Sequence, residues 1–395
     1  MGSRSNGSPL ISNHLFTALL RTVSVPGNFV VTSLGIFSNL ANIIIFAKIS
    51  PKDTMTTCSL ALAVADLLYA IFSMPPLIAN ILIQSGIQVV NNVDLFSLTF
   101  IGFLHQKPLF HKISVIILTF MSCERSLCVI RPFLVKQIFT RQRIINILIV
   151  IFLGVTALFM PAMVSVKAVW RTPYNKTTPV MMIRVKPERA AFENVIHMSV
   201  GLPLIVASQV IIIVSSVLMA SGLRRHQKFR QGASSMATKS ENEMKKSTFE
   251  NHHNKSAEQR AKSCNEEASV AVKPIKSGCS DGNAVTENVK SKLQEKSLAK
   301  AEIASTKEQR LIKTVLMLAI LHIALNFPKF IYYAVYYLVP EFRLRKRYNN
   351  TYRLSGSITN LLNALDGMLN TFVYLSVNTK YKLLFKQVFC GQKAL

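Results

Sequence analysis

The sequence predicts an all-α membrane protein, a bundle of seven transmembrane helices followed by a short amphipathic helix. Of its 395 residues, 50% are hydrophobic and only 16% are charged, and the mean hydropathy is +0.32. This mixture is too apolar for an ordinary soluble domain and too polar for a chain that lies in the membrane throughout. Long apolar runs alternate with charged connectors, as in a multi-pass membrane protein.

Seven apolar windows are long enough to cross a bilayer. A helix rises about 1.5 Å per residue, so about 20 apolar residues span the ~30 Å hydrocarbon layer. The third and seventh windows contain several polar side chains, which we expect to face the interior of the bundle, where they have partners. The predicted spans are Gly27–Ile49, Cys58–Ile83, Ser97–Val129, Ile144–Val169, Val195–Ser221, Leu311–Val339 and Leu354–Val377.

These spans divide the chain into five regions. They are an extracellular N-terminal segment (1–26), the first five helices (27–221), a third cytoplasmic loop (222–308), the last two helices (309–377), and an amphipathic helix with a short tail (378–395). The third cytoplasmic loop has almost no large apolar residues, so it cannot offset the entropy lost on ordering. We expect disorder through most of it, with its ends continuing the flanking helices.

The distribution of Lys and Arg sets the predicted orientation. The first and second predicted cytoplasmic connectors and the C-terminal tail are basic, which places them in the cytoplasm of a plasma-membrane protein and the N-terminus outside. The loop Pro340–Tyr352 is also basic but falls outside, so it is an exception. Three glycosylation sequons, which begin at Asn6, Asn175 and Asn349, all fall on the predicted outer side.

The segment after the seventh span is expected to lie on the inner leaflet. Between Asn378 and Cys390, Tyr381, Leu384 and Phe385 share one face of a helix, and lysines lie largely on the other. We therefore predict an amphipathic helix that contacts membrane lipids, with Cys390 available for palmitoylation.

Several function classes are disfavoured. The formal net charge of +27 invites a nucleic-acid interpretation, but no nucleic-acid-binding motif accompanies it, and basic cytoplasmic loops explain it better. The sequence has no metal-ligand cluster, nucleophile elbow or phosphate-binding glycine loop, so we do not expect an enzyme or a structural metal. The six cysteines predict no structural disulfide.

Glu124-Arg125-Ser126 ends the third predicted span, where the rhodopsin-like G-protein-coupled receptors have Asp/Glu-Arg-Tyr. With seven spans, an outside N-terminus and a short final helix, the chain resembles this family. The resemblance implies that an extracellular ligand signals to a heterotrimeric G protein through helix rearrangement around Arg125, with arrestin and receptor kinases as further partners. Arg125 keeps its charge and needs a carboxylate. Glu124 and Glu308, twenty residues before Pro328, are the two candidates for this ionic lock. A surface salt bridge of little energy remains the alternative.

Other positions that match the family form the expected activation network. Leu60–Asp66 is close to the second-helix motif of the family, and Asn370-Thr371-Phe372-Val373-Tyr374 resembles its Asn-Pro-x-x-Tyr with threonine for proline. The network comprises Asn39, Asp66, Pro203, Asn326, Pro328, Asn363, Asp366, Asn370 and Tyr374.

The chain also departs from the family. Asn326 and His322 replace the aromatic residues of the sixth helix. Phe100 occupies the place of the extracellular cysteine, and the loop Arg171–Ala191 has none, so that loop is either held in another way or mobile.

Asp66 needs a partner. A carboxylate among so many apolar residues would cost several kcal/mol if it were unpaired. The resemblance implies a sodium ion held with polar groups of the seventh helix, for which Asn363, Asp366 and Asn370 are the candidates. A buried polar cluster without an ion is the alternative.

Helical spacing predicts the ligand pocket. Lys107 lies 18 residues before Arg125, about 27 Å away by the helical rise. Amine receptors have an aspartate at this place, and a lysine would repel an amine. The seventh span has no lysine from 356 to 377, so an opsin-like Schiff base is not expected.

Lys107 and His111 share one helix face, and so do Lys329 and Tyr333. We therefore expect a ligand with a carboxylate or phosphate, or an acidic peptide. The alternative is that Lys107 extends to the headgroups while pocket water or a neighbouring acid stabilises Lys329.

The sequence also allows a competing function and a narrower assignment within the family. A seven-span secondary transporter with Asp66 and Asp366 as ion sites is the competing function, although paired repeats with broken helices are not seen. The departures from the family pattern, the long third cytoplasmic loop and the short tail resemble divergent invertebrate receptors of the peptide or chemosensory kind.

Overall fold

The computed structural model describes residues 10–49, 53–103, 106–131, 135, 137–172, 178–186, 203–225, 282–343 and 346–391. The chain forms two units, Met1–Met219 with Arg310–Leu395, and Ala220–Gln309. The predicted glycosylation sites Asn6 and Asn175 lie outside the described residues, as does most of the third cytoplasmic loop.

The first helix begins earlier than predicted. Helix α1 (Asn13–Leu19) continues through a π-helical turn, η1 (Leu20–Ser24), into α2 (Val25–Lys48). The Ser12 side chain accepts a hydrogen bond from the Leu15 backbone N–H at 3.2 Å, which caps the free end of the helix. Residues 13–26, which were predicted to be part of the N-terminal segment, are therefore helical, and the Ser12 cap stabilises the start of this helix.

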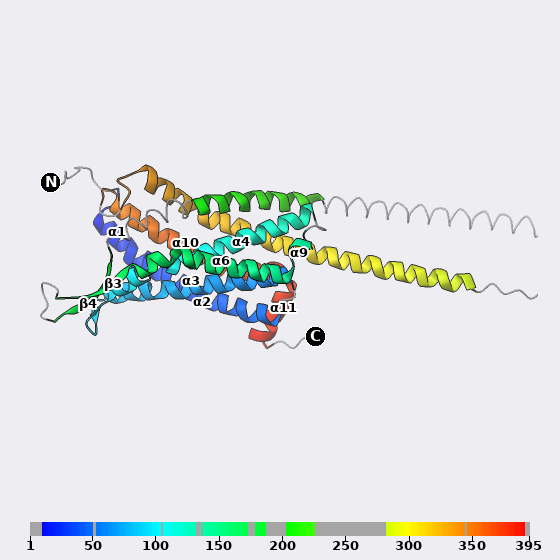
Figure 1. Cartoon of the computed structure of the whole chain (residues 1–395), viewed down its shortest axis with the longest axis horizontal. Helices are drawn as coiled ribbons and strands as arrows, with labels where there is room; N and C mark the ends of the chain where they lie inside the picture. Colours follow the sequence, from blue (N-terminus) through cyan, green and yellow to red (C-terminus); the bar gives the residue numbers. More distant parts are fainter. Residues whose placement is uncertain are drawn as a thin grey trace, which may run out of the picture. The chain divides into compact units, whose positions relative to one another are not determined.

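Helix α3 lies at the centre of the first half of the bundle. It spans Thr54–Gln84 and packs against α2, against α4 (Gln106–Ile130), which follows a second π-helical turn, η2 (Ser97–Ile101), and against α6 (Arg141–Val164). These helices run side by side (Figure 1). The arrangement brings the polar side chains of α3 next to the third predicted span.

The second half of the bundle consists of the helix Pro203–Arg225, α9 (Gly282–Leu338) and α10 (Asn349–Val377). Within the first unit, α10 packs against α2 and α3, and the short α11 (Thr379–Phe389) packs against α2 and α10. Helix α9 begins inside the predicted third cytoplasmic loop, so the expected continuation of the sixth span into that loop is seen from Gly282.

Six described helices are long and apolar enough to cross a membrane. The seventh predicted span corresponds to α10, which is long enough but carries Asn363, Asp366 and Asn370. All three are buried, as expected for polar groups that face the interior of a bundle. The predicted all-α, seven-helix membrane fold is therefore confirmed.

The fourth span is shorter than predicted. Helix α6 ends at Val164 instead of Val169, because the chain continues as strand β3 (Val166–Arg171), which pairs antiparallel with β4 (Val180–Val185). Strand pairing satisfies the backbone groups of these residues as well as a helix would. The apolar run alone cannot distinguish the two outcomes.

The hairpin β3–β4 belongs to a four-stranded sheet in the order β1-β2-β4-β3. The short strands β1 (Val89–Val90) and β2 (Val93–Asp94) are joined by Asn91 and Asn92, which have φ values of 49° and 59°. Positive φ at both central residues is typical of a two-residue hairpin turn, and asparagine tolerates it well. The sheet lies at one end of the bundle and α11 at the other (Figure 1).

Candidate functional site

Arg125 is held in a buried three-residue clamp. Its Nη2 donates to the Glu124 Oε1 at 3.1 Å and to the Thr54 Oγ1 at 3.1 Å, and the Thr54 hydroxyl donates to the same Glu124 oxygen at 2.7 Å. Glu124 is only 1% exposed and Arg125 only 6%. A buried ion pair of this kind is strongly unfavourable to break on one side only, so the clamp favours one arrangement of α3 and α4.

The second predicted lock residue, Glu308, lies in the other unit of the chain. Glu308 is exposed and belongs to the unit Ala220–Gln309, whereas Arg125 belongs to the other unit. The lock between Arg125 and Glu308 therefore stays a prediction, and the carboxylate that pairs with Arg125 in this structure is Glu124.

Asp66 is satisfied by hydrogen bonds from two other helices. The Ser114 hydroxyl of α4 donates to its Oδ1 at 2.6 Å, and the Asn370 Nδ2 of α10 donates to its Oδ2 at 2.8 Å. A Cβ at Gly367 would approach Asp66 to 3.2 Å, so glycine permits the close contact of α3 and α10. Asn39 of α2 donates to the Gly367 carbonyl at 3.2 Å. Three predicted network residues thus meet here.

A sodium ion at this place is compatible with the residues present. Among the described residues, no group of three His, Cys, Asp or Glu side chains is placed to hold a metal ion. A hard cation, however, takes oxygen ligands, and Asp66 and Ser114 offer a carboxylate and a hydroxyl oxygen at one point.

Asp366 forms a separate cluster one turn before Asn370. Its Oδ2 accepts a hydrogen bond from the Asn326 Nδ2 at 2.9 Å and lies 2.7 Å from the Nδ1 of His322. All three side chains are buried, so the cluster joins α9 to α10 in the interior. The two residues that depart from the family pattern in the sixth helix are therefore partners of Asp366.

The C-terminal half of α10 contacts α2 and α11. Thr371 donates to the Asn42 Oδ1 at 3.1 Å and Tyr381 donates to the same oxygen at 2.6 Å. The Tyr374 ring packs edge-on against Phe46, with 4.9 Å between ring centres. Burial raises the pKa of the Tyr381 phenol, so it remains a donor at neutral pH.

The two predicted prolines have different surroundings. Pro328 lies inside α9, as expected for a proline within a span. Pro203 is the first described residue of its helix, so a kink at that position remains a prediction.

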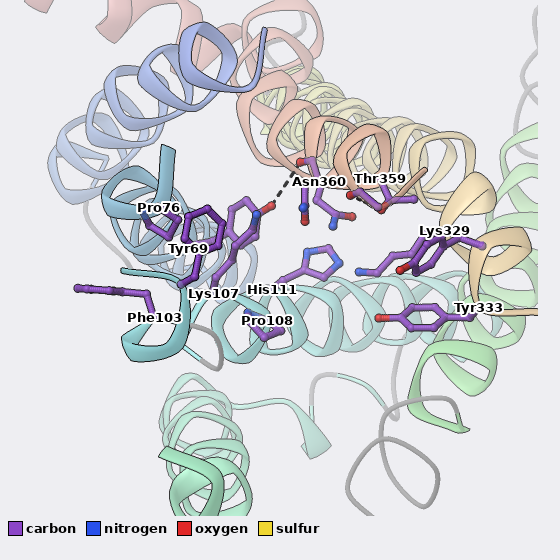
Figure 2. Close-up of a pocket in the computed structure, with 14 residues that line it drawn as sticks. Tyr69, Pro76, Phe103, Lys107, Pro108, His111, Lys329, Tyr333, Thr359 and Asn360 are labelled. Atoms are coloured by element: carbon purple, nitrogen blue, oxygen red, sulfur yellow. Dashed lines mark hydrogen bonds between the residues drawn. The ribbon is translucent and has the colours of Figure 1, made fainter. Parts of the chain in front are cut away.

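A cavity of about 320 Å³ opens between α3, α4, α9 and α10. Lys107 and His111 of α4 and Lys329 and Tyr333 of α9 all line it, so the four side chains predicted from helical spacing surround one space. Figure 2 shows Lys329 reaching from α9 toward His111. Aromatic, amide and apolar groups complete the lining: Tyr69, Pro76, Phe100, Phe103, Pro108, Tyr332, Gly356, Thr359, Asn360 and Asn363.

The electrostatic character of this cavity is positive. The lining, all of it described, contains two lysines and no Asp or Glu. The Lys107 ammonium lies 5.5 Å from the centre of the Tyr69 ring, and the Tyr69 hydroxyl donates to the Asn360 carbonyl at 3.4 Å (Figure 2). Both lysines are half-buried. The cavity is therefore suited to an anionic group with an apolar or aromatic body.

The sequence of this chain matches a known protein family. The family described as 7 transmembrane receptor (rhodopsin family) matches residues 38–374, which include the clamp, both buried clusters and the cavity. The chain belongs to this family. A search of curated proteins gave no match. The chain is thus a multi-pass membrane receptor of a signalling family whose members respond to an extracellular ligand and act on G proteins.

The described part of the loop Arg171–Ala191 is attached to the bundle by hydrogen bonds and strand pairing. Four described cysteines, Cys58, Cys123, Cys128 and Cys390, are free. Instead, Val93 of β2 pairs with Met181 of β4, and the Met181 N–H donates to the Asn92 carbonyl at 2.7 Å. The Ile183 N–H also donates to the Ser97 Oγ at 3.0 Å. The sequence leaves open whether this loop is mobile or is held by something other than a disulfide. Its described part is held by strand pairing and by the hydrogen bond to Ser97.

Two further predicted modification sites are described. Cys390 is exposed directly after α11, so it is accessible to palmitoylation. Asn349 is half-buried at the first position of α10. Its modification, like that of Cys390, remains a prediction.

Sequence reasoning missed the hydroxyl residues of the receptor's polar clusters. Thr54 completes the Arg125 clamp, Ser114 satisfies Asp66, and Ser97 anchors the outer loop. Serine and threonine are frequent in spans and give no signal of their own. Only the position of Thr54 could have suggested its role, because it is the first residue of α3 and directly follows a basic connector.

Proposed function

We propose that this receptor binds an extracellular anionic ligand in the cavity between α3, α4, α9 and α10 and activates a heterotrimeric G protein through rearrangement around Arg125. The observation that supports the ligand class is the pair of half-buried lysines, Lys107 and Lys329, around one cavity whose described lining has no acid. A carboxylate or phosphate group would supply the missing charge, with charge-assisted hydrogen bonds to both.

The ligand acts by favouring one arrangement of the helices. Lys107 belongs to α4 and Lys329 to α9, so an anion bound by both connects the two helices. A ligand shifts a conformational equilibrium only by its difference in affinity for the two states. An anion that contacts both lysines in one state and a single lysine in the other has such a difference.

The outer surface supports capture of an anion. Lys and Arg side chains are exposed on the sheet and on the loop between α9 and α10, and they would raise the local concentration of anions. They are Arg171, Arg184, Lys186, Arg343, Lys346 and Arg347. The basic loop that contradicted the orientation rule thus has a role in ligand capture.

At the cytoplasmic end, activation requires the Arg125 clamp to open. The guanidinium cannot lose its charge, so release from Glu124 and Thr54 must be compensated by new acceptors. A G protein supplies them in this proposal. Arrestin and receptor kinases are expected to compete for the same cytoplasmic side.

Sodium is proposed as an allosteric ion at Asp66. Its oxygen ligands would come from Asp66 and Ser114, and the ion would stabilise the resting packing of α3, α4 and α10. Replacement of sodium chloride by choline chloride is expected to lower the melting temperature of the wild type and to leave that of Asp66→Asn unchanged; an equal response of both proteins contradicts the proposal.

The ligand proposal is tested with paired variants. Cells that express the wild type, Lys107→Ala or Lys329→Ala are exposed to sets of carboxylates, phosphates and acidic peptides, and G-protein activation is measured. We expect each substitution to lower the potency of active anions by roughly tenfold or more, because a charge-assisted contact contributes about 1.5–3 kcal/mol. The exposed Lys382 of α11, at the opposite end of the bundle from the sheet and replaced by Ala, is the matched control. Unchanged potency in both cavity variants would rule out the anionic ligand.

A further inference from the structure

A second, smaller cavity adjoins the first. It has a volume of about 30 Å³ and lies between α4, α9 and the helix Pro203–Arg225. Pro108, His111, Lys329 and Tyr333 line both cavities, so the two spaces are neighbours with a common wall. This second cavity, called the inner cavity below, has a volume that accommodates one small polar group rather than a whole ligand.

Lys112 is the distinctive residue of the inner cavity. It follows Lys107 by five residues, a rotation of about 140° around the helix, so it cannot point into the same space as Lys107. Lys112 is only 7% exposed, and its ammonium lies 4.7 Å from the centre of the Phe159 ring of α6. A cation–π contact of this kind offsets only part of the unfavourable burial of a charge.

The rest of the lining offers hydrogen-bond donors. The Gln209 amide comes from the helix Pro203–Arg225 and the Tyr333 hydroxyl from α9. Two other polar groups of the lining are already engaged, since the Ser208 hydroxyl donates to the Ile205 carbonyl and the Asn326 amide donates to Asp366 and to the His322 carbonyl. The lining, which consists of described residues, contains two lysines and neither Asp nor Glu. Hydroxyl, amide and ammonium groups that converge on a small space without an acid form a set suited to an anion.

The carboxylate that acts on Lys329 already has partners of its own. Asp366 is the carboxylate that acts electrostatically on Lys329, but its Oδ2 accepts from Asn326 and contacts His322. Within the described part of the chain, no ion pair or hydrogen bond joins Lys107, Lys112 or Lys329 to another residue. Three ammonium groups therefore share two adjoining cavities, more positive charge than a single carboxylate can balance.

We infer that the inner cavity is an anion subsite, in which Lys112 and Lys329 bind one small anionic group. This inference rests on the proposed function for the outer cavity and sharpens it: the ligand carries two acidic groups, one beside Lys107 and one beside Lys112, with Lys329 between them. A free chloride ion has the same chemistry and is the other source of such a group.

The test uses purified full-length receptor in detergent and needs no knowledge of the natural ligand. The probes are straight-chain monocarboxylates and dicarboxylates of matched length, and sodium chloride against sodium gluconate, whose anion is too large for the subsite. Binding is followed through the melting temperature, since a ligand that binds the folded state raises it. The wild type, Lys112→Met, Lys112→Arg and the exposed control Lys382→Met of α11 are compared.

If the anionic group in the subsite belongs to the ligand, the wild type should bind the dicarboxylate roughly tenfold more tightly than the monocarboxylate. Lys112→Met should then lose this preference but keep the wild-type affinity for the monocarboxylate. A free ion predicts a chloride-dependent rise in melting temperature that Lys112→Met removes. Either result supports the subsite, and Lys112→Arg is expected to retain it. If Lys112→Met does not fold, Gln209→Leu carries the same comparison.

The subsite is overturned if Lys112→Met retains the same preferences as the wild type, or if the wild type prefers neither dicarboxylate over monocarboxylate nor chloride over gluconate. Failure of the proposed function gives another pattern: no anion then activates the G protein, and Lys107→Ala changes nothing, whereas chloride binding at Lys112 can still be observed. The two failures are therefore distinguishable.

Discussion

The Thr54 hydroxyl links the two members of the buried ion pair at Arg125. It accepts a hydrogen bond from Arg125 and donates one to Glu124, so it closes the triangle between the charged pair and α3. The Arg125 Nε and the Glu124 Oε2 are buried and have no hydrogen-bond partner among the described residues. The clamp is therefore only partly satisfied, and loss of one further contact should matter.

We predict that Thr54→Val raises signalling without ligand. The isosteric valine removes both hydrogen bonds at constant volume, and a net loss of about 1 kcal/mol in the resting state corresponds to roughly a fivefold shift in the equilibrium. Basal nucleotide exchange on a purified G protein measures this shift. Thr54→Ser keeps the hydroxyl and should behave like the wild type. Equal basal rates for Thr54→Val and Thr54→Ser would show that the hydroxyl does not hold the clamp.

At the same scale, the four side chains predicted from helical spacing line one cavity, whereas the hydrogen-bonding partner of Asp66 could not be predicted. Lys107, His111, Lys329 and Tyr333 follow from helical spacing measured against Arg125 and Pro328, because a helix fixes which side chains share a face. The contact of Asp66 with Ser114 depends on how two helices rotate against each other. Spacing within one helix carries no information about that rotation.

Among the elements, the outer sheet replaces a covalent bond with main-chain pairing. The hairpin β3–β4 is attached to β2 by the pair Val93–Met181 and to η2 by the hydrogen bond from the Ile183 N–H to Ser97. The sheet could not be predicted from the sequence, since the residues after Val164 continue an apolar run. Whether such a run ends a helix or begins a strand depends on whether a partner strand is present to pair with it.

Ser97→Ala is expected to weaken this attachment. The Ile183 N–H would lose its acceptor, which should lower the free energy of unfolding by about 1 kcal/mol and speed ligand release. The melting temperature and the dissociation rate of a bound anion are the measurements, and Ser97→Thr, which retains the hydroxyl, is the control. A reducing agent should have no effect on either quantity; a drop in melting temperature with reductant would contradict a loop held without a disulfide.

For the whole molecule, the number and order of helices could be predicted because the bilayer demands about 20 apolar residues per crossing. Even α10, whose composition is too polar for a simple hydropathy test, was predicted from the expectation that its polar face is buried. The ends of the helices were less predictable. Capping by Ser12 and strand pairing after Val164 are local contacts that override the apolar pattern.

The orientation of the chain across the membrane is a prediction about the whole molecule. An epitope placed before residue 10 should be detected on intact cells, and one placed between 226 and 281 only after the membrane is permeabilised, because basic connectors remain in the cytoplasm. Removal of glycans should shift the electrophoretic mobility of the wild type and not that of a variant with Asn6, Asn175 and Asn349 replaced by Gln. Detection of the inner epitope on intact cells would reverse the topology.

The cluster of His322, Asn326 and Asp366 has a consequence for engineering. Asp366 accepts from Asn326 and lies beside His322, so an aromatic side chain introduced at position 322 or 326 would remove one of the two partners of a buried carboxylate, and an amide at 366 would leave the imidazole with a weaker partner. If both aromatic residues typical of the family were restored in the sixth helix, Asp366 would keep neither partner. They are therefore compatible with a stable receptor only when position 366 is changed as well.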